Sequence, residues 1–251
     1  EHELRRVHLQ FYPSCIEKCS PLLSYMLKTH APEGKAPEQK PIGIVYEDDS
    51  IVVVNKPENV LSAPAKDESL FNVESWLQSL HPELSFIKVI HRLDQPTSGL
   101  LIAAKSIEIY KKMQEQFNGH TIRKQYLAWV EGKLPSECGV LNVPMCPNPD
   151  ERPRQIVNWQ SGKTSVTRYQ VVRRTEERTL VRLFPFTGRT HQLRLHCASP
   201  FGLDHPITGD SLYTIEPYCL NQGRLMLQAQ KITFVHPVTG KTMTFELEPE
   251  F

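Results

Sequence analysis

One acidic residue stands in a tight turn directly before an apolar run, and this segment constrains the fold more than any other. Residues 90–105 read IHRLDQPTSGLLIAAK, in which Asp94 follows His91 and Arg92. The apolar run 100–104 predicts a buried strand that holds the turn in place. An acid fixed beside a cation on a rigid element is a candidate reactive carboxylate, whereas a helix cap or a turn-forming Asp is the structural alternative.

The rest of the chain is predicted to combine a few helices with mostly antiparallel strands. Hairpins are expected over residues 44–54 and 225–247, and further strands over 122–130, 164–172 and 179–184. Runs of strands interrupted by helices are typical of an α+β fold and not of a regular parallel βαβ array.

Two helices are predicted from capping residues that precede apolar stripes. Ser69 is expected to cap a helix whose stripe runs from Leu70 to Leu80, and Ser106 a second helix that ends at Gly119. Each helix would bury its apolar stripe, because such a stripe is stable only when it is packed on another element.

Residues 1–41 are predicted to be a helical extension followed by a proline-rich linker, and residues 42–251 a separate domain. Ser20, followed by Pro, is a good helix start, and residues 31–41 read APEGKAPEQKP. The chain begins at Glu1 and not at an initiator Met. This is compatible with a longer N-terminal region of which the extension is the end.

Composition gives weak information about partners. Lys and Arg number 29 against 28 Asp and Glu, so any nucleic-acid site must come from a local cluster of basic residues. No apolar stretch approaches the roughly 20 residues of a membrane span. Six scattered cysteines suit a reducing cytoplasm, where we expect the protein to act. Cys15 and Cys19 could form half a metal site, but ordinary buried thiols are the favoured interpretation.

The segment RKQYLAWV, residues 123–130, is predicted to be a strand with Lys124 and Tyr126 on one face. A Tyr in that position can stack on a base, donate a hydrogen bond, or act as a general base if a nearby cation lowers its pKa. Taken alone, the segment favours the structural alternative, a half-buried Tyr with its hydroxyl group in water.

The segment TGRTHQLRLH is predicted to open a helix at Thr187, with Arg189 in the first turn. Arg189 could pair with a buried carboxylate or hold a phosphate, and a surface arginine is the alternative. His191 and His196 are five residues apart, so neither a helix nor a strand presents both to one metal ion.

Three long segments together resemble the RluA family of pseudouridine synthases, in that family's order and spacing: HRLDQPTSGLLIAAK, RKQYLAWVEG and GRTHQLRLHCASPFGLDHPITGDSLY. The resemblance covers residues 42–251 and leaves 1–41 outside. It implies a pseudouridine synthase catalytic domain. The expected fold is a long, mixed, mostly antiparallel sheet with flanking helices and an active-site cleft across its middle.

The resemblance also implies roles for individual residues. Asp94 matches the catalytic aspartate, Tyr126 the tyrosine that packs on the target base and assists proton removal, and Arg189 the arginine that pairs with the aspartate and preserves its charge. His91 and Arg92 match positions against the RNA. The other RNA-binding residues that we expect are Lys56, Thr97, Lys124 and His191, and phosphate contacts are also expected from Arg123, Arg152, Arg154, Lys163 and Arg168.

The implied reaction is the isomerisation of a specific uridine to pseudouridine in 23S-type ribosomal RNA or in transfer RNA. It needs no cofactor, and we expect a monomer with no membrane partner. The base must flip out to be reached. Asp94 could then add to C6 of the base, act at C1′ of the sugar, or take a sugar proton, and these routes stay open. An N-glycosidic hydrolase and a catalytically silent RNA-binding module are the alternative functions.

Overall fold

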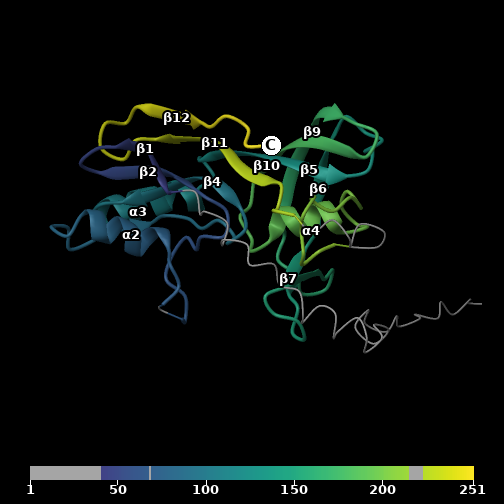
Figure 1. Cartoon of the computed structure of the whole chain (residues 1–251), viewed down its shortest axis with the longest axis horizontal. Coiled ribbons are helices and arrows are strands. Elements are labelled where there is room, and N and C mark those ends of the chain that lie inside the picture. The colour runs from purple at the N-terminus through teal and green to yellow at the C-terminus, as the bar shows by residue number, and fades with distance from the viewer. Residues whose placement is uncertain (1–40, 68, 215–222) are drawn as a thin grey trace, which may run out of the picture. The chain divides into compact units, whose positions relative to one another are not determined.

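The computed structural model describes residues 41–67, 69–214 and 223–251 (Figure 1). The helix and the linker predicted for residues 1–41 lie outside the described residues, apart from Pro41. The division of the chain at that point therefore stays a prediction.

One sheet of ten strands runs through the described residues, in the order β1-β2-β4-β11-β5-β10-β9-β6, with β3 added on β4 and β12 on β11 (Figure 1). Its β4–β11 pair is parallel, and its other pairs are antiparallel. The predicted α+β class and the mixed, mostly antiparallel sheet are confirmed. The strands are β1 (Gly43–Glu47), β2 (Ile51–Lys56), β3 (Lys88–Val89), β4 (Ser98–Ala104), β5 (Arg123–Glu131), β6 (Cys138–Asn142), β9 (Val166–Arg174), β10 (Arg178–Pro185), β11 (Leu227–Val235) and β12 (Thr242–Glu246).

In the part of the chain that the structure describes, three helices flank this sheet: α2 (Val73–Leu80), α3 (Ile107–Asn118) and α4 (Gln192–Ala198). Alternate residues of β2 and β4 pack with α2 or with α3, so these two helices cover opposite faces and β4 is buried throughout. Helix α4 packs on β5 and β10 in the other half of the sheet. A small separate hairpin pairs β7 (Met145–Pro147) with β8 (Gln155–Val157).

The two predicted capping serines have different outcomes. Ser106 does cap α3, and its hydroxyl oxygen accepts from the backbone N–H of Ile109 at 3.3 Å. Ser69 does not cap α2, because its hydroxyl donates to Asp67 at 2.6 Å. Asn72 caps that helix instead, so the helix starts later than predicted and Leu70 lies before it, 44% exposed.

Helix α4 also begins later than predicted, at Gln192 and not at Thr187. The side-chain oxygen of Gln192 accepts from the Thr187 hydroxyl at 2.7 Å and from the Arg189 backbone N–H at 3.0 Å. These bonds fold the preceding residues into a turn, and His191 takes a left-handed conformation with φ of 54°. Arg189 therefore precedes the helix, and the prediction that it lies in the first turn is wrong.

Gly99 allows β4 to approach β11 closely. Its φ is +113°, and a Cβ there would overlap the Ala229 carbonyl and lie 2.7 Å from the Ala229 nitrogen. We expect Gly99→Ala to lower the free energy of unfolding by roughly 3 kcal/mol, measured by urea denaturation. Gly43→Ala is the matched control, since its Cβ would meet Asn55 at an ordinary 3.9 Å. Equal unfolding midpoints for the two variants would contradict the close approach.

Candidate active site

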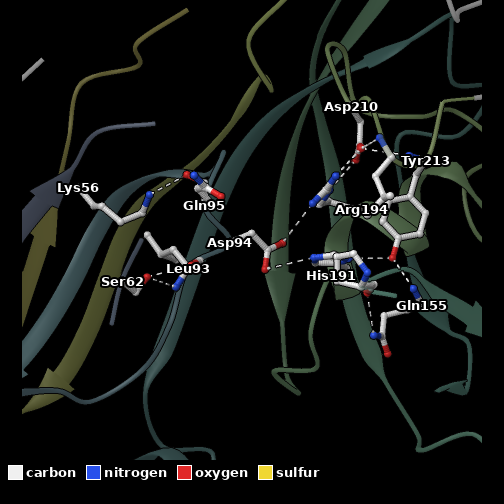
Figure 2. Close-up of polar contacts among 12 residues, drawn as sticks. Lys56, Ser62, Leu93, Asp94, Gln95, Gln155, His191, Arg194, Asp210 and Tyr213 are labelled. Carbon is white, nitrogen blue, oxygen red and sulfur yellow. Dashed lines mark hydrogen bonds and ion pairs between the residues drawn. The ribbon is translucent and has the colours of Figure 1, made fainter. Parts of the chain in front are cut away.

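The loop that carries Asp94 is held on both sides of that residue (Figure 2). The Ser62 hydroxyl group donates to the Leu93 carbonyl at 2.9 Å and accepts from the Leu93 N–H at 3.0 Å. The Lys56 ammonium donates to the carbonyl of Gln95 at 3.1 Å. Because both neighbours are fixed by buried groups, the Asp94 carboxylate is presented in a defined direction.

Two nitrogen-bearing side chains from one end of α4 face this carboxylate. Arg194 Nη1 lies 3.9 Å from Asp94 Oδ2, and His191 Nε2 lies 4.0 Å from Asp94 Oδ1 (Figure 2). The Asp94 side chain keeps 24% of its surface exposed. It is therefore partly shielded from water, opposite a guanidinium, and still open to a ligand.

A second carboxylate holds the guanidinium in place. Arg194 donates from Nε to Asp210 Oδ2 at 2.8 Å and from Nη2 to Asp210 Oδ1 at 2.6 Å. The Asp210 side chain is fully buried, and its Oδ1 also accepts from the backbone N–H groups of Leu212 and Tyr213. This bidentate pair leaves Nη1 directed at Asp94 and raises the pKa of Arg194 against the effect of burial, so the cation is permanent.

The imidazole of His191 is oriented by a tyrosine. Its Nδ1 lies 3.0 Å from the Tyr213 hydroxyl, which accepts from the Gln155 N–H at 2.7 Å (Figure 2). We assign the Tyr213 hydroxyl as the donor to Nδ1, which places the ring proton on Nε2, toward Asp94. Burial lowers the pKa of His191, with Asp94 opposing and Arg194 adding to that effect, so the neutral ring is favoured.

Tyr126 on β5 lies where two parts of the hydrophobic core meet, and its half-buried ring packs against both. Burial raises the pKa of its phenol well above 10, and the nearby charge of Asp94 raises it further. The hydroxyl therefore stays protonated at neutral pH. It is a hydrogen-bond donor and a flat surface, not a general base with a lowered pKa.

These side chains line one cleft of about 880 Å³. Asp94, Tyr126, His191 and Arg194 share it, and its walls also include Arg92, Lys124 and Arg189. A cleft of this size accommodates a nucleotide together with part of its neighbours.

Known proteins resemble this chain over most of its length. Residues 50–199 match the family model described as RNA pseudouridylate synthase. The chain is 36% identical over 220 residues to the dual-specificity RNA pseudouridine synthase RluA of Haemophilus influenzae, covering 87% of this chain and 98% of the relative. It is 40% identical over 205 residues to RluA of Vibrio cholerae, covering 82% of each. The chain belongs to the RluA family of RNA pseudouridine synthases.

Solved structures show the same fold. Human RNA pseudouridylate synthase domain containing 1 superposes with a TM-score of 0.69 at 24% identity, covering 86% of each chain. Human RNA pseudouridylate synthase domain containing 4 gives 0.68 at 24% identity, covering 82% of this chain and 88% of that one. The pseudouridine synthase fold expected from the sequence is confirmed. Enzymes of this family isomerise uridine in RNA, so the chain is an isomerase and RNA is its partner.

The predicted pair between Arg189 and Asp94 is wrong. Arg189 is exposed and donates from Nε to the Thr164 carbonyl at 3.4 Å, and Arg194 is the arginine beside Asp94. The late start of α4 is the cause, because it places Arg194 one helical turn from His191 on the same face. The three-residue spacing of His191 and Arg194 is compatible with this arrangement, but no local pattern in the sequence distinguishes Arg194 from Arg189.

Two predicted RNA contacts are not presented to RNA. Lys56 is 0% exposed, and its ammonium donates to the carbonyls of Pro57, Val60 and Gln95 at 2.8–3.1 Å. Burial lowers the pKa of Lys56 to about 7, and the charge of Asp94 opposes this. Thr97 is 2% exposed with a buried hydroxyl group. Lys56 supports the Asp94 loop from the interior, and Thr97 lies along the cleft and donates its backbone N–H to the Asp94 carbonyl at 3.0 Å. Neither side chain has enough exposed surface to bind a phosphate.

The other four predicted RNA-binding residues, His91, Arg92, Lys124 and His191, line the cleft, whereas the residues predicted for further phosphate contacts, Arg123, Arg152, Arg154, Lys163 and Arg168, do not. Arg92 is exposed on the cleft wall, and Lys124 lies there with its ammonium 5.8 Å from the Phe117 ring. The His91 ring also packs on Phe117, and its Nε2 accepts from the Ile102 N–H at 3.3 Å. Burial lowers the pKa of His91 to about 3, so it is a neutral part of the wall.

The two histidines considered for a metal point to different partners. His196 lies between the hydroxyls of Ser165 at 2.9 Å and Thr167 at 3.0 Å, whereas His191 faces Asp94. No group of three His, Cys, Asp or Glu side chains is arranged for a metal within residues 41–67, 69–214 and 223–251. None of the helices in those ranges is long and apolar enough to cross a membrane.

Proposed function

We propose that Asp94 is the reacting carboxylate with which this chain converts a flipped-out uridine of ribosomal or transfer RNA to pseudouridine. The observation that carries the assignment is the position of Asp94 in the cleft, 3.9 Å from Arg194 and in a loop fixed by Ser62 and Lys56. A carboxylate that faces a permanent cation is positioned to act on the base or the sugar.

Arg194 would keep the carboxylate charged and aimed while the cleft is filled. A base that enters the cleft displaces water, which removes favourable solvation of the carboxylate charge. A guanidinium locked by Asp210 offsets that loss without having to reorganise. Neutral His191 can donate its Nε2 proton to Asp94 or to a polar atom of the base.

Tyr126 and Arg92 would stabilise the extruded nucleotide. Unstacking a base costs a few kcal/mol of free energy, and stacking of the base on an aromatic ring offsets part of that cost. Tyr126 supplies that ring from inside the cleft, and exposed Arg92 can reach the phosphates or the space that the base leaves. The isomerisation makes and breaks bonds within one nucleotide, so no cofactor is part of the proposal.

The target is proposed to be 23S-type ribosomal RNA, transfer RNA or both, modified in the cytoplasm by a monomer. Relatives that are 36% and 40% identical to this chain over the aligned residues are named dual-specificity synthases. An open cleft that reads the shape of an RNA loop can accept similar loops from two RNAs.

The decisive test uses RNA labelled with tritium at C5 of uridine. A synthase releases the tritium to water and leaves the chain intact, a glycosidic hydrolase liberates free uracil, and a silent RNA-binding module does neither. We expect tritium release without free uracil. Either of the other outcomes would replace the proposed function.

For Tyr126→Phe we expect slower turnover with RNA affinity retained, because the ring is kept and the hydroxyl donor is lost. The raised pKa also predicts that no tyrosine ionisation appears in the wild-type rate profile between pH 7 and 9. Single-turnover rates measured across that range for both proteins check this. Equal rates at every pH would remove the hydroxyl from the mechanism.

A further inference from the structure

Two large aromatic side chains are exposed together, outside the set of residues that line the cleft. Trp159 is 62% exposed and Phe201 is 61% exposed, and their rings meet edge to face with centroids 5.9 Å apart. Large aromatic rings are normally buried for much of their surface, so an exposed pair marks a contact surface. We call Trp159 and Phe201 the aromatic pair.

The backbone under both rings is fixed. The Asn158 side chain accepts from the backbone N–H groups of Gln160 and Ser161, both at 2.9 Å, and this holds the turn that carries Trp159. The Ser199 hydroxyl accepts from the N–H of Phe201 at 3.2 Å. The rings are thus presented on preformed turns, which lowers the entropy lost when a ligand binds.

The two segments that carry the aromatic pair also contribute to the wall of the cleft or contact it. Pro153 lines the cleft at one end of the segment that carries Trp159, and the Thr164 carbonyl at the other end accepts from Arg189, which also lines the cleft. Phe201 follows α4, whose first end faces Asp94. That helix has seven residues and is about 10 Å long, the distance of roughly two nucleotides along a strand.

The segment that carries Trp159 is rich in basic residues. Residues 152–174 contain six Lys and Arg and no Asp or Glu, and two of the six, Arg154 and Arg174, pair with Glu151 and Glu137 outside the segment. Arg152, Lys163 and Arg189 are exposed, and none of them has a carboxylate within ion-pair distance in the described part of the chain. Cations beside a flat aromatic surface bind phosphate and base together.

We propose that the aromatic pair stacks on an unpaired base of the substrate RNA that flanks the target uridine by a few nucleotides. In this proposal, the phosphates between that unpaired base and the target uridine are bound by Arg152, Lys163 and Arg189. This inference rests on the proposed function and deepens it, because it assigns a second anchoring point for the substrate RNA outside the catalytic cleft. A protein partner or a second copy of the chain is the competing occupant, and the unpaired positive charge argues against both.

The test compares Trp159→Leu with Trp159→Phe in the full chain. The probe is the RNA that wild type binds most tightly in a pool of unmodified transfer RNA and ribosomal RNA transcripts. We expect Trp159→Leu and Phe201→Leu each to weaken binding about tenfold, because they keep an apolar side chain and lose the ring. Trp159→Phe should stay within about threefold of wild type, and turnover at saturating RNA should be unchanged in all three.

Salt dependence separates stacking from charge. Trp159→Leu should leave the slope of log affinity against log salt as in wild type, whereas Lys163→Gln should reduce it by about one. Affinity of Trp159→Leu within twofold of wild type would overturn the proposal. So would a change in oligomeric state with RNA affinity retained, which would assign the surface to protein. If RNA affinity depends on Trp159 but the wild-type protein releases no tritium, the proposed function is refuted and the RNA-binding role of the aromatic pair is retained.

Discussion

Replacing Asp94 by Asn is expected to abolish pseudouridine formation while RNA binding changes little. The amide keeps the shape of the side chain and loses the negative charge that would act on the nucleotide. Removal of a reacting group of this kind lowers turnover by at least about a thousandfold. Single-turnover tritium release measures the rate, and titration of the same RNA measures the affinity.

The fold of this variant should be undisturbed, since the bonds that hold the loop go to the backbone of Leu93 and Gln95 and not to the carboxylate. Asp49→Asn is the matched control, because it removes the same charge from an exposed acid in the turn between β1 and β2. We expect wild-type turnover from it. Substantial residual turnover in Asp94→Asn would discard the role proposed for Asp94.

The Asp94 loop was predictable because its determinants are close together in the sequence. The apolar run that became β4 follows the turn directly, and burial of that whole strand is what the composition of residues 100–104 predicts. Strand β5 was predictable for a similar reason. Its alternation places Lys124 and Tyr126 on one face, and both do line the cleft.

The arginine was not predictable from the same segment, because its position depends on where α4 begins. Arg189 and Arg194 are both in GRTHQLRLH, and a start at Thr187 favours the first. The Gln192 side chain delays the start and turns Arg194 toward Asp94. The partner Asp210 is a further 16 residues along the chain, beyond the reach of a local pattern.

Lys56 shows why the charge of a residue alone does not identify an RNA contact. A lysine is expected to be solvated, yet carbonyls of three residues, one of them 39 positions away, surround its ammonium and allow complete burial. Among the strands that the sequence did not reveal, β3, β7 and β8 have two or three residues each. Such lengths are too short for the alternation of polar and apolar residues to be distinguished from a loop.

Arg194→Met is expected to reduce turnover by at least about a hundredfold and also to destabilise the fold. The reacting carboxylate loses its facing cation, an electrostatic contribution of that order. The variant also leaves Asp210 as a buried, unpaired charge, which costs about 3–5 kcal/mol in unfolding free energy. Denaturation and single-turnover rates on the same preparation measure the two effects.

A double variant separates the loss of turnover from the loss of stability. Arg194→Met combined with Asp210→Asn removes the stranded charge, and the amide oxygen can still accept from the N–H groups of Leu212 and Tyr213. Most of the stability should return while turnover stays low, because Asp94 still lacks its partner. Arg189→Met is the matched control from the same motif and should keep wild-type turnover at saturating RNA. If the double variant recovers activity together with stability, Arg194 is a structural residue, and the electrostatic role proposed for it must be abandoned.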